Sequence, residues 1–143
     1  MIYLDTSFLT PLFRAEETSD KVQAFLNNQP AGSLAFSLWT RVEFASVIAR
    51  DVRMRKLSTN IATELLDEFE ALAESSLHIL TPSGADFDLA QQFVAEFRSE
   101  LRGPDALHLS IAKNHRLSEI LSLDEGLLLA CRRLKIKARR GIR

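Results

Sequence analysis

The chain has little of what builds disulfide frameworks, zinc sites or disordered linkers. Its one cysteine, Cys131, excludes a disulfide and a structural zinc site made within one chain. Glycine and proline are also scarce, with 5 and 4 residues among 143, which is untypical of disordered proteins. We therefore expect an ordered protein in a reducing, cytoplasmic setting.

Long apolar runs are absent as well. No stretch approaches the roughly 18 apolar residues that a membrane span needs. The N-terminus has no basic segment followed by an apolar one, which is the pattern of an export signal. The sequence thus predicts a protein that is not exported and has no membrane partner.

What is present is the composition of an ordinary globular protein, with 46% hydrophobic and 26% charged residues. A chain of this length buries roughly 68 to 70% of the surface that it exposes when unfolded. That is enough for a core without covalent staples. We predict a single domain over residues 1–143.

The net charge of −1 conceals an asymmetry between the body of the chain and its end. The last twelve residues contain no acid, so residues 1–131 carry a net charge of −8. We expect this basic end, at 132–143, to contact RNA or an acidic partner segment, whereas a solvated and partly frayed tail is the alternative. The residues predicted to bind RNA are Arg132, Arg133, Lys135, Lys137, Arg139 and Arg140.

Short apolar runs alternate with helical patterns along the chain. The runs at 2–4 and 120–123 stop at Asp5 and Asp124, and further short runs lie at 34–36, 77–80 and from Ile136. Helices are predicted over 8–13, 16–28, 38–53, 61–74, 83–97 and 106–114, the third and fourth forming a hairpin. This alternation predicts an α/β/α sandwich with a mostly parallel sheet.

The helix predicted over 38–53 is apolar nearly all round, so we expect most of it to be buried, with one stripe formed by Leu38, Val42, Ala45, Ala49 and Val52. Glu43 lies within it, and its carboxylate is expected in a partly enclosed space. An ionised carboxylate there needs a partner. Arg50 is the partner in a purely structural interpretation.

Four carboxylates stand out: Asp5, Glu43, Asp105 and Asp124. Alone, Asp5 and Asp124 are typical helix N-caps, and Asp105 stands where a helix dipole favours an acid. In a parallel sheet, however, the two strand ends meet at one edge, where ligands bind. Converging carboxylates with few histidines or cysteines favour Mg²⁺ or Mn²⁺.

Such an ion activates water and orients a phosphodiester without a side-chain nucleophile. Thr6, Ser7 and Ser122 are candidates to orient the carboxylates or to bind water on the ion, and caps or strand-end hydroxyls in the alternative interpretation.

Three segments carry a resemblance to a known family. LDTS at 4–7, PDALHLSIA at 104–112 and SLDEGLLLA at 122–130, with Glu43 between the first two, resemble a PIN domain of the VapC toxin type. The resemblance spans essentially the whole chain. It implies a metal-dependent ribonuclease in which Asp5, Glu43, Asp105 and Asp124 bind Mg²⁺ or Mn²⁺ and Ser7 and Ser122 support them.

The resemblance further implies a homodimer and an antitoxin whose C-terminal segment covers the active site. One departure concerns the metal count, because Gly126 stands where some family members carry another acid. One tightly held ion is the expectation that follows.

The remaining candidates are interpreted as structural. We expect His108, which follows Asp105 by one helical turn, to be a core or interface residue rather than a proton donor. His78, His115, Asp86 and Asp88 are interpreted as structural, and Trp39 as core rather than a platform for nucleobases.

The main hypothesis is an endoribonuclease toxin, and the alternative is a non-catalytic module that binds RNA or a partner. Phosphate enzymes with a strand-end Asp nucleophile are disfavoured, because they need a second acid where Ser7 stands.

Overall fold

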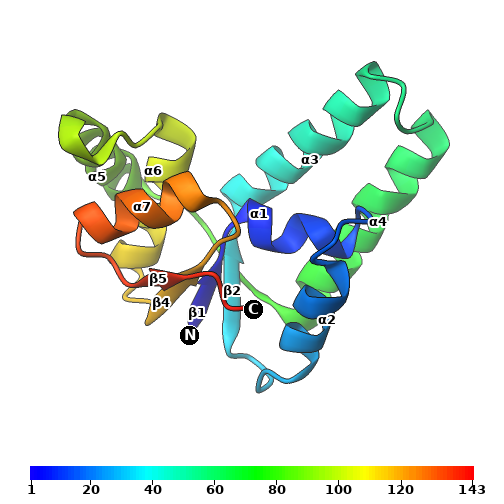
Figure 1. Ribbon diagram of the computed structural model, residues 1–143, viewed down its shortest axis with the longest axis horizontal. Helices are drawn as coiled ribbons and strands as arrows, with labels where there is room; N and C mark the ends of the chain where they lie inside the picture. The colour runs from blue at the N-terminus through cyan, green and yellow to red at the C-terminus, as the bar shows by residue number, and fades with distance from the viewer.

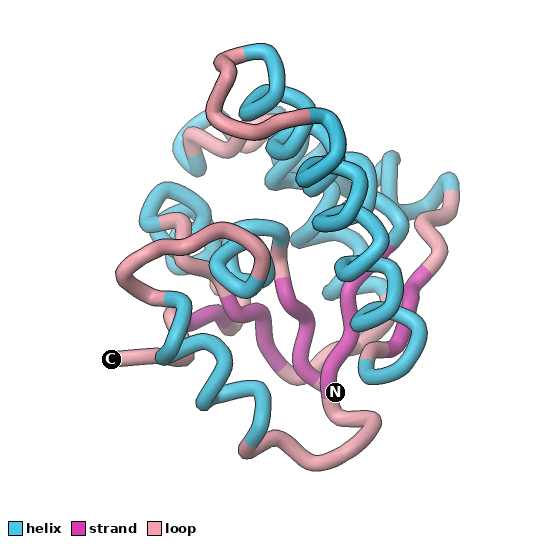
Figure 2. Tube along the Cα trace, turned by 90° about the vertical axis from the view of Figure 1, so that its right-hand side faces the viewer, coloured by secondary structure: helices cyan, strands magenta, loops and turns pink.

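Five parallel strands run through the centre of the molecule in the order β3-β2-β1-β4-β5. The structure is a computed structural model that describes all 143 residues. The strands are short: β1 (Ile2–Leu4), β2 (Leu34–Ser37), β3 (His78–Leu80), β4 (Glu119–Leu121) and β5 (Ala138–Arg139). The predicted sandwich is confirmed (Figure 2), and its sheet is wholly parallel.

Helices cover both faces of the sheet (Figure 1). One face carries α1 (Thr6–Leu9), the 3₁₀ turn η1 (Thr10–Leu12), α2 (Ser19–Asn27), α3 (Leu38–Arg53) and α4 (Thr59–Ser76). The other carries α5 (Gly84–Ala95), the 3₁₀ turn η2 (Phe97–Ser99), α6 (Gly103–Asn114) and α7 (Glu125–Arg133). None of these helices combines the length and the apolar composition needed to cross a bilayer.

Successive residues of the central strands point into different cores, as the alternation of a strand requires. Tyr3 and Ile120 contribute to the core under α5, α6 and α7. Their neighbours Leu4 and Leu121 contribute to the core under α1 to α4. The central strands are therefore buried on both sides, which explains why they are continuous apolar runs in the sequence.

The order of the strands decides where polar side chains gather. From β1 the chain moves to β2 and β3 on one side, and later to β4 and β5 on the other. This reversal creates a crevice beyond the carboxyl ends of the strands around β1. Asp5 and Asp124 follow β1 and β4 there, and Ser37 is the last residue of β2.

Helix α3 has the predicted bounds, but the predicted burial is wrong. Its buried residues are Thr40, Phe44, Ile48 and Asp51. Val42, in the predicted stripe, is 54% exposed. The reason is that α3 packs on one side only, where Phe44 stacks on Phe69 of α4 with ring centroids 4.3 Å apart. This contact confirms the predicted hairpin, whose far end extends away from the sheet (Figure 1).

Smaller differences concern the ends of elements. The first helix begins at Thr6 rather than at position 8, because Asp5 caps it. Helix α5 ends at Ala95, since Glu96 leaves the helical region with a ψ of 78°, and Phe97 then lies outside it. The last strand begins at Ala138, two residues after the predicted start.

The basic end is not a frayed tail. It comprises the last turn of α7 and strand β5, which pairs with β4. Arg139 binds both carboxylate oxygens of Glu119, at 2.9 and 3.0 Å. Arg140 pairs with Glu125 at 3.1 Å. Part of the basic charge is therefore neutralised within the chain.

Removing the Arg139 side chain tests how firmly this end is held. We expect Arg139→Ala to lower the free energy of unfolding by about 1 to 2 kcal/mol, because the buried carboxylate of Glu119 loses its partner. Arg140→Ala is the matched control and should cost under about 0.5 kcal/mol, since the Glu125 side chain is 70% exposed. Urea denaturation measures both, and equal losses would contradict this difference.

The same pair predicts a pH dependence. The hydrogen bond from Arg139 outweighs burial and lowers the pKa of Glu119 below its ordinary value of 4.5. Such a group contributes stability in full above its unfolded pKa and loses it as pH falls through its folded pKa. The difference between wild type and Arg139→Ala should therefore be constant near neutral pH and shrink below about pH 4.

Candidate active site

A cavity of about 430 Å³ lies at the carboxyl edge of the sheet, between α1, α3, α6 and the start of α7. All four predicted carboxylates line it: Asp5, Glu43, Asp105 and Asp124. Thr6 and Ser7 line it too. Residues more than a hundred positions apart in the sequence thus share one site, and their roles there stay predictions.

Asp5 is the most buried of the four, with 4% of its surface exposed. As the N-cap of α1 it accepts the backbone N–H of Phe8 at 3.0 Å. Ser122 Oγ donates to its Oδ2 at 2.7 Å, and Ser7 Oγ lies 2.8 Å from its Oδ1. Burial raises the pKa of Asp5, and these hydrogen bonds together with His108 oppose that rise. The carboxylate is consequently held in one orientation.

The two serines also join the ends of β1 and β4. Ser7 Oγ accepts the N–H of Leu123 at 2.9 Å, and Ser122 Oγ accepts the N–H of Asp124 at 3.0 Å. Asp124 is itself the N-cap of α7, accepting the N–H of Leu127 at 3.0 Å. The capping interpretation of Asp5 and Asp124 is correct, and it leaves further lone pairs of each carboxylate free to face the cavity.

Glu43 finds its partners on other elements, and Arg50, its partner in the purely structural interpretation, is not among them. Thr6 Oγ1 donates to Glu43 Oε1 at 2.6 Å, and His108 Nε2 bonds the same oxygen. Arg50 is two turns away, about 10 Å along the helix axis. Burial raises the pKa of Glu43. The hydrogen bond and the charge of His108, with the hydrogen bond of Thr6, lower the pKa by more than burial raises it, so it lies below its usual value.

His108 also connects the site to the core, a link that the sequence did not indicate. It is 1% exposed, so the prediction of a buried histidine is correct. Its Nδ1 lies 2.7 Å from the hydroxyl of Tyr3, which lies 2.8 Å from Ser37 Oγ. One signal was available: Tyr3 precedes Asp5 by two residues and therefore shares its side of the strand.

Asp105 is the carboxylate whose charged form is disfavoured by the site and which has no hydrogen-bonding partner. It is half-buried near the start of α6. Burial, followed by the charge of Asp124, raises the pKa of Asp105 to about 6, and Glu43 and Asp5 add to the rise against the lowering effect of His108. The cavity thus holds negative charge that nothing nearby fully compensates.

The donor set fits a hard divalent cation. No three His, Cys, Asp or Glu side chains stand close enough to hold an ion as they lie. The four carboxylates nevertheless line one cavity and repel one another, which is the condition that a cation relieves. An all-oxygen donor set suits Mg²⁺ or Mn²⁺ better than zinc.

Other predicted residues lie around the rim. Trp39, predicted in the core, is only partly buried; its Nε1 donates to the carbonyl of Pro104 at 3.1 Å, and both residues line the cavity. Glu125 is paired with Arg140. A side chain at position 126 would require the Asp124 side chain to shift slightly, because a Cβ on Gly126 would lie 3.1 Å from Asp124 Oδ1.

The predicted RNA-binding residues of the basic end do not line this cavity. Arg133 alone among them lines a neighbouring cavity that contains Asp105 and Asp124. Asp86 is structural as predicted: it caps α5 and accepts a hydrogen bond from Asn114 at 2.7 Å.

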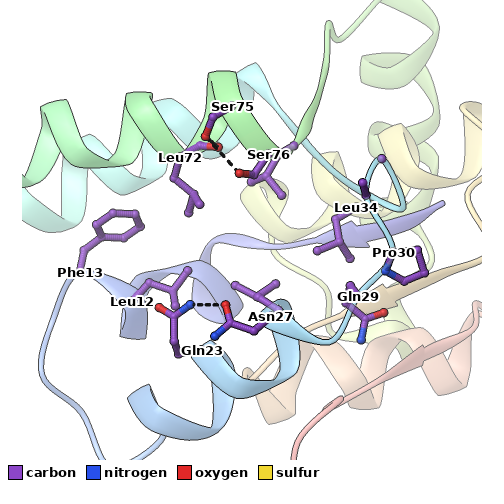
Figure 3. A pocket seen from close by; sticks show the side chains of 14 residues that line it. Leu12, Phe13, Gln23, Asn27, Gln29, Pro30, Leu34, Leu72, Ser75 and Ser76 are labelled. Atoms are coloured by element: carbon purple, nitrogen blue, oxygen red, sulfur yellow. Dashed lines mark hydrogen bonds between the residues drawn. The ribbon is translucent and has the colours of Figure 1, made fainter.

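A further cavity of about 440 Å³ lies at the opposite edge of the sheet, between η1, α2, α4 and the start of β2 (Figure 3). Apolar side chains such as Phe13 and Leu72 line it together with the amides of Gln23 and Asn27, which are hydrogen bonded to each other. No charged side chain lines it.

This chain is similar to known proteins in sequence pattern and in fold. The sequence model of the PIN domain family matches residues 2–132. No curated protein sequence matches significantly.

Solved structures share the fold at low identity. VapC20 of Mycobacterium tuberculosis, described as a sarcin-ricin loop cleaving toxin, is 13% identical with a TM-score of 0.73, covering 91% of this chain and 95% of that one. FitAcB of Neisseria gonorrhoeae is 19% identical with a TM-score of 0.71, covering 99% and 98%. VapBC2 of Rickettsia felis, bound to a promoter DNA fragment, is 16% identical with a TM-score of 0.63, covering 97% and 98%.

The repulsion around Asp105 predicts that this residue destabilises the metal-free protein. Its raised pKa means that stability falls as pH rises through about 6. Asp105→Asn should therefore raise the free energy of unfolding near pH 7.5 by about 1 kcal/mol, a few degrees in Tm. Mn²⁺ should raise the Tm of the wild type and leave that of the variant unchanged.

Thermal unfolding with chelator and with Mn²⁺ measures both effects. Asp88→Asn, which removes an exposed charge from α5, is the matched control and should behave as wild type. Identical Tm values for wild type and Asp105→Asn in chelator would contradict the predicted repulsion.

Proposed function

The chain belongs to the PIN domain family, and from that premise we propose that it is a Mg²⁺- or Mn²⁺-dependent endoribonuclease, the toxin of a type II toxin-antitoxin pair. One observation carries the proposal. Four carboxylates from four separate segments line one cavity, where burial, and after it the charge of Asp124, raises the pKa of Asp105 to about 6. Such a set is costly to the fold unless it binds a cation.

We assign the metal ligands to Asp5, Glu43, Asp105 and Asp124. When bound, a divalent cation lowers the pKa of water and offsets negative charge on the phosphate. Ser7 and Ser122 hold the carboxylate of Asp5 in place, and Thr6 and His108 hold that of Glu43. Because Gly126 adds no fifth acid to the set, we expect one tightly bound ion.

The partner of this toxin is proposed to be a cognate antitoxin. Structures that share the fold include complexes titled FitAB and VapBC, and a toxin-antitoxin complex of Klebsiella pneumoniae. We propose that the C-terminal segment of an antitoxin covers the acidic cavity, whose negative charge suits a basic side chain.

We also propose a homodimer and place its interface on an apolar patch formed by Phe87, Val94 and Phe97. Phe97 is 85% exposed, and the patch surrounds an apolar cavity of about 600 Å³ that Trp39 also lines. A contiguous apolar patch of this kind is uncommon on a monomer. A second copy brings the same aromatic and aliphatic groups to cover it.

RNA cleavage tests the proposed activity. The purified protein should cut a mixed RNA pool with Mg²⁺ or Mn²⁺, and chelator should stop it. Asp5→Asn and Asp105→Asn should each lower the rate at least about 100-fold, because each removes a proposed metal ligand.

Asp88→Asn removes the same charge from the surface of α5 and should cleave as wild type does. Cleavage that persists in a folded double variant of Asp5 and Asp105 would refute the assignment. A folded, metal-loaded wild type that binds RNA without cutting it would favour the non-catalytic module.

Phe97→Glu tests the dimer interface. Placing a charge in the centre of the patch should raise the dissociation constant of the dimer at least about 10-fold, since charges are depleted from interface cores. Light scattering over a range of concentrations measures it. Val42→Glu, at an exposed apolar residue of α3 outside the patch, is the control, and an equal effect of both substitutions would remove the patch from the interface.

A further inference from the structure

The acidic cavity continues into two others. A cavity of about 310 Å³ shares Asp105 and Asp124 with it, and is otherwise lined by Arg102, Gly126, Arg133 and their neighbours. A third cavity, of about 550 Å³, shares Arg133 with the second and is lined by Arg98 and Lys135. This row of adjoining cavities, which we call the channel, has the proposed metal ligands at one end and three cations with one acid, Glu96, at the other.

The four cations of this channel come from two segments. Arg98 and Arg102 lie in the connection between α5 and α6, while Arg133 and Lys135 lie at the end of α7 and just beyond it. All four side chains are exposed. Helix α7 packs on η2, which brings the two segments together.

Two of these cations have no acidic partner. Arg102 and Lys135 take part in no ion pair. Arg133 pairs with Glu100 at 3.3 Å and Arg98 with Glu96 at 3.5 Å, but the Glu100 side chain is 77% exposed. Exposed pairs of this kind are worth about 0 to 1 kcal/mol. A phosphate, which accepts bidentate hydrogen bonds from arginine, competes with them effectively.

We propose that Arg102, Arg133 and Lys135, with Arg98, bind consecutive backbone phosphates of the RNA strand on one side of the bond that is cut. This cation track rests on the proposed ribonuclease function. The occupant is a polyanion, because the outer cavity is lined by three cations against one acid, Glu96, which is already paired with Arg98, and by only one apolar side chain. Gly126 keeps the passage from the carboxylates open, since it places no side chain in it.

The track keeps two residues of the basic end, Arg133 and Lys135, as RNA contacts and adds Arg98 and Arg102. Arg139 and Arg140 are engaged with acids of the chain, and neither they nor Arg132 and Lys137 line the channel. Arg102, by contrast, lies outside the basic end and stands three residues before Asp105. It is close enough in the chain to position a phosphate beside the carboxylates.

RNA binding measured in chelator tests the track without any cleavage. The probe is a fluorescent single-stranded RNA oligonucleotide, and its affinity is measured by anisotropy over a range of salt concentrations. The variant Arg102→Gln/Lys135→Gln should bind at least about 10-fold more weakly. Its log-log salt dependence should be shallower by about 1.4, because each phosphate contact to a single strand contributes about 0.7.

Two further variants serve as controls. Arg53→Gln/Arg55→Gln removes two exposed cations near the far end of the α3–α4 hairpin (Figure 1), and Arg55, like Lys135, has a positive φ. It should bind as wild type does. Arg102→Lys/Lys135→Arg keeps both charges and should retain the wild-type salt dependence.

The outcomes separate the track from the proposed activity. If Arg102→Gln/Lys135→Gln binds RNA with the affinity and salt dependence of wild type, the track is wrong, whether or not the protein cleaves RNA. If this variant binds more weakly than its control while wild type cuts nothing with either metal, the track stands and the ribonuclease proposal fails. If Arg102→Gln/Lys135→Gln and the hairpin control lose RNA affinity equally, the loss is explained by the change in net charge alone, and the track is wrong.

Discussion

The buried carboxylate of Asp5 is the constraint on which the rest of the site depends. An ionised group that is 4% exposed needs several hydrogen bonds to remain charged. Ser122, Ser7 and the backbone of Phe8 supply them, and in doing so the serines bind the backbone beyond β4. Satisfying one charge therefore aligns the ends of two neighbouring strands, and with them the starts of α1 and α7.

The other carboxylates are held less tightly, and the difference has a physical basis. Glu43 has a histidine and a threonine as partners, so its charge is partly compensated. Asp105 has no such partner, and burial together with the neighbouring acids raises its pKa. The site thus combines one carboxylate that is held in place by hydrogen bonds, Asp5, with another whose charge is not compensated, Asp105. Stability is lower there than the same fold could achieve, as is common at functional sites.

Charge is distributed along the channel in the order that a polyanionic substrate requires. Carboxylates at one end attract a cation, and the arginines and lysine of the track attract the phosphates that extend beyond it. The apolar patch lies on the other side of the site, where Trp39 and Pro104 line both its cavity and the acidic one. The proposed RNA track and the proposed dimer interface are therefore different surfaces, and they adjoin at Phe97 and Arg98 as well as at this rim.

The sequence by itself determined the alternation of strands and helices, and hence the parallel sheet, because apolar periodicity and capping residues act locally. It also singled out the four carboxylates, since strand ends of a parallel sheet must meet at one edge. Only the tertiary structure decided their partners. His108 replaces Arg50 beside Glu43, and Tyr3 joins that contact to the core. These contacts join residues 65 and 105 positions apart. Likewise, folding pairs Arg139 with Glu119, whereas Arg102 forms no ion pair. Local pattern fixes which groups are charged, but packing between distant segments decides which of those charges are compensated.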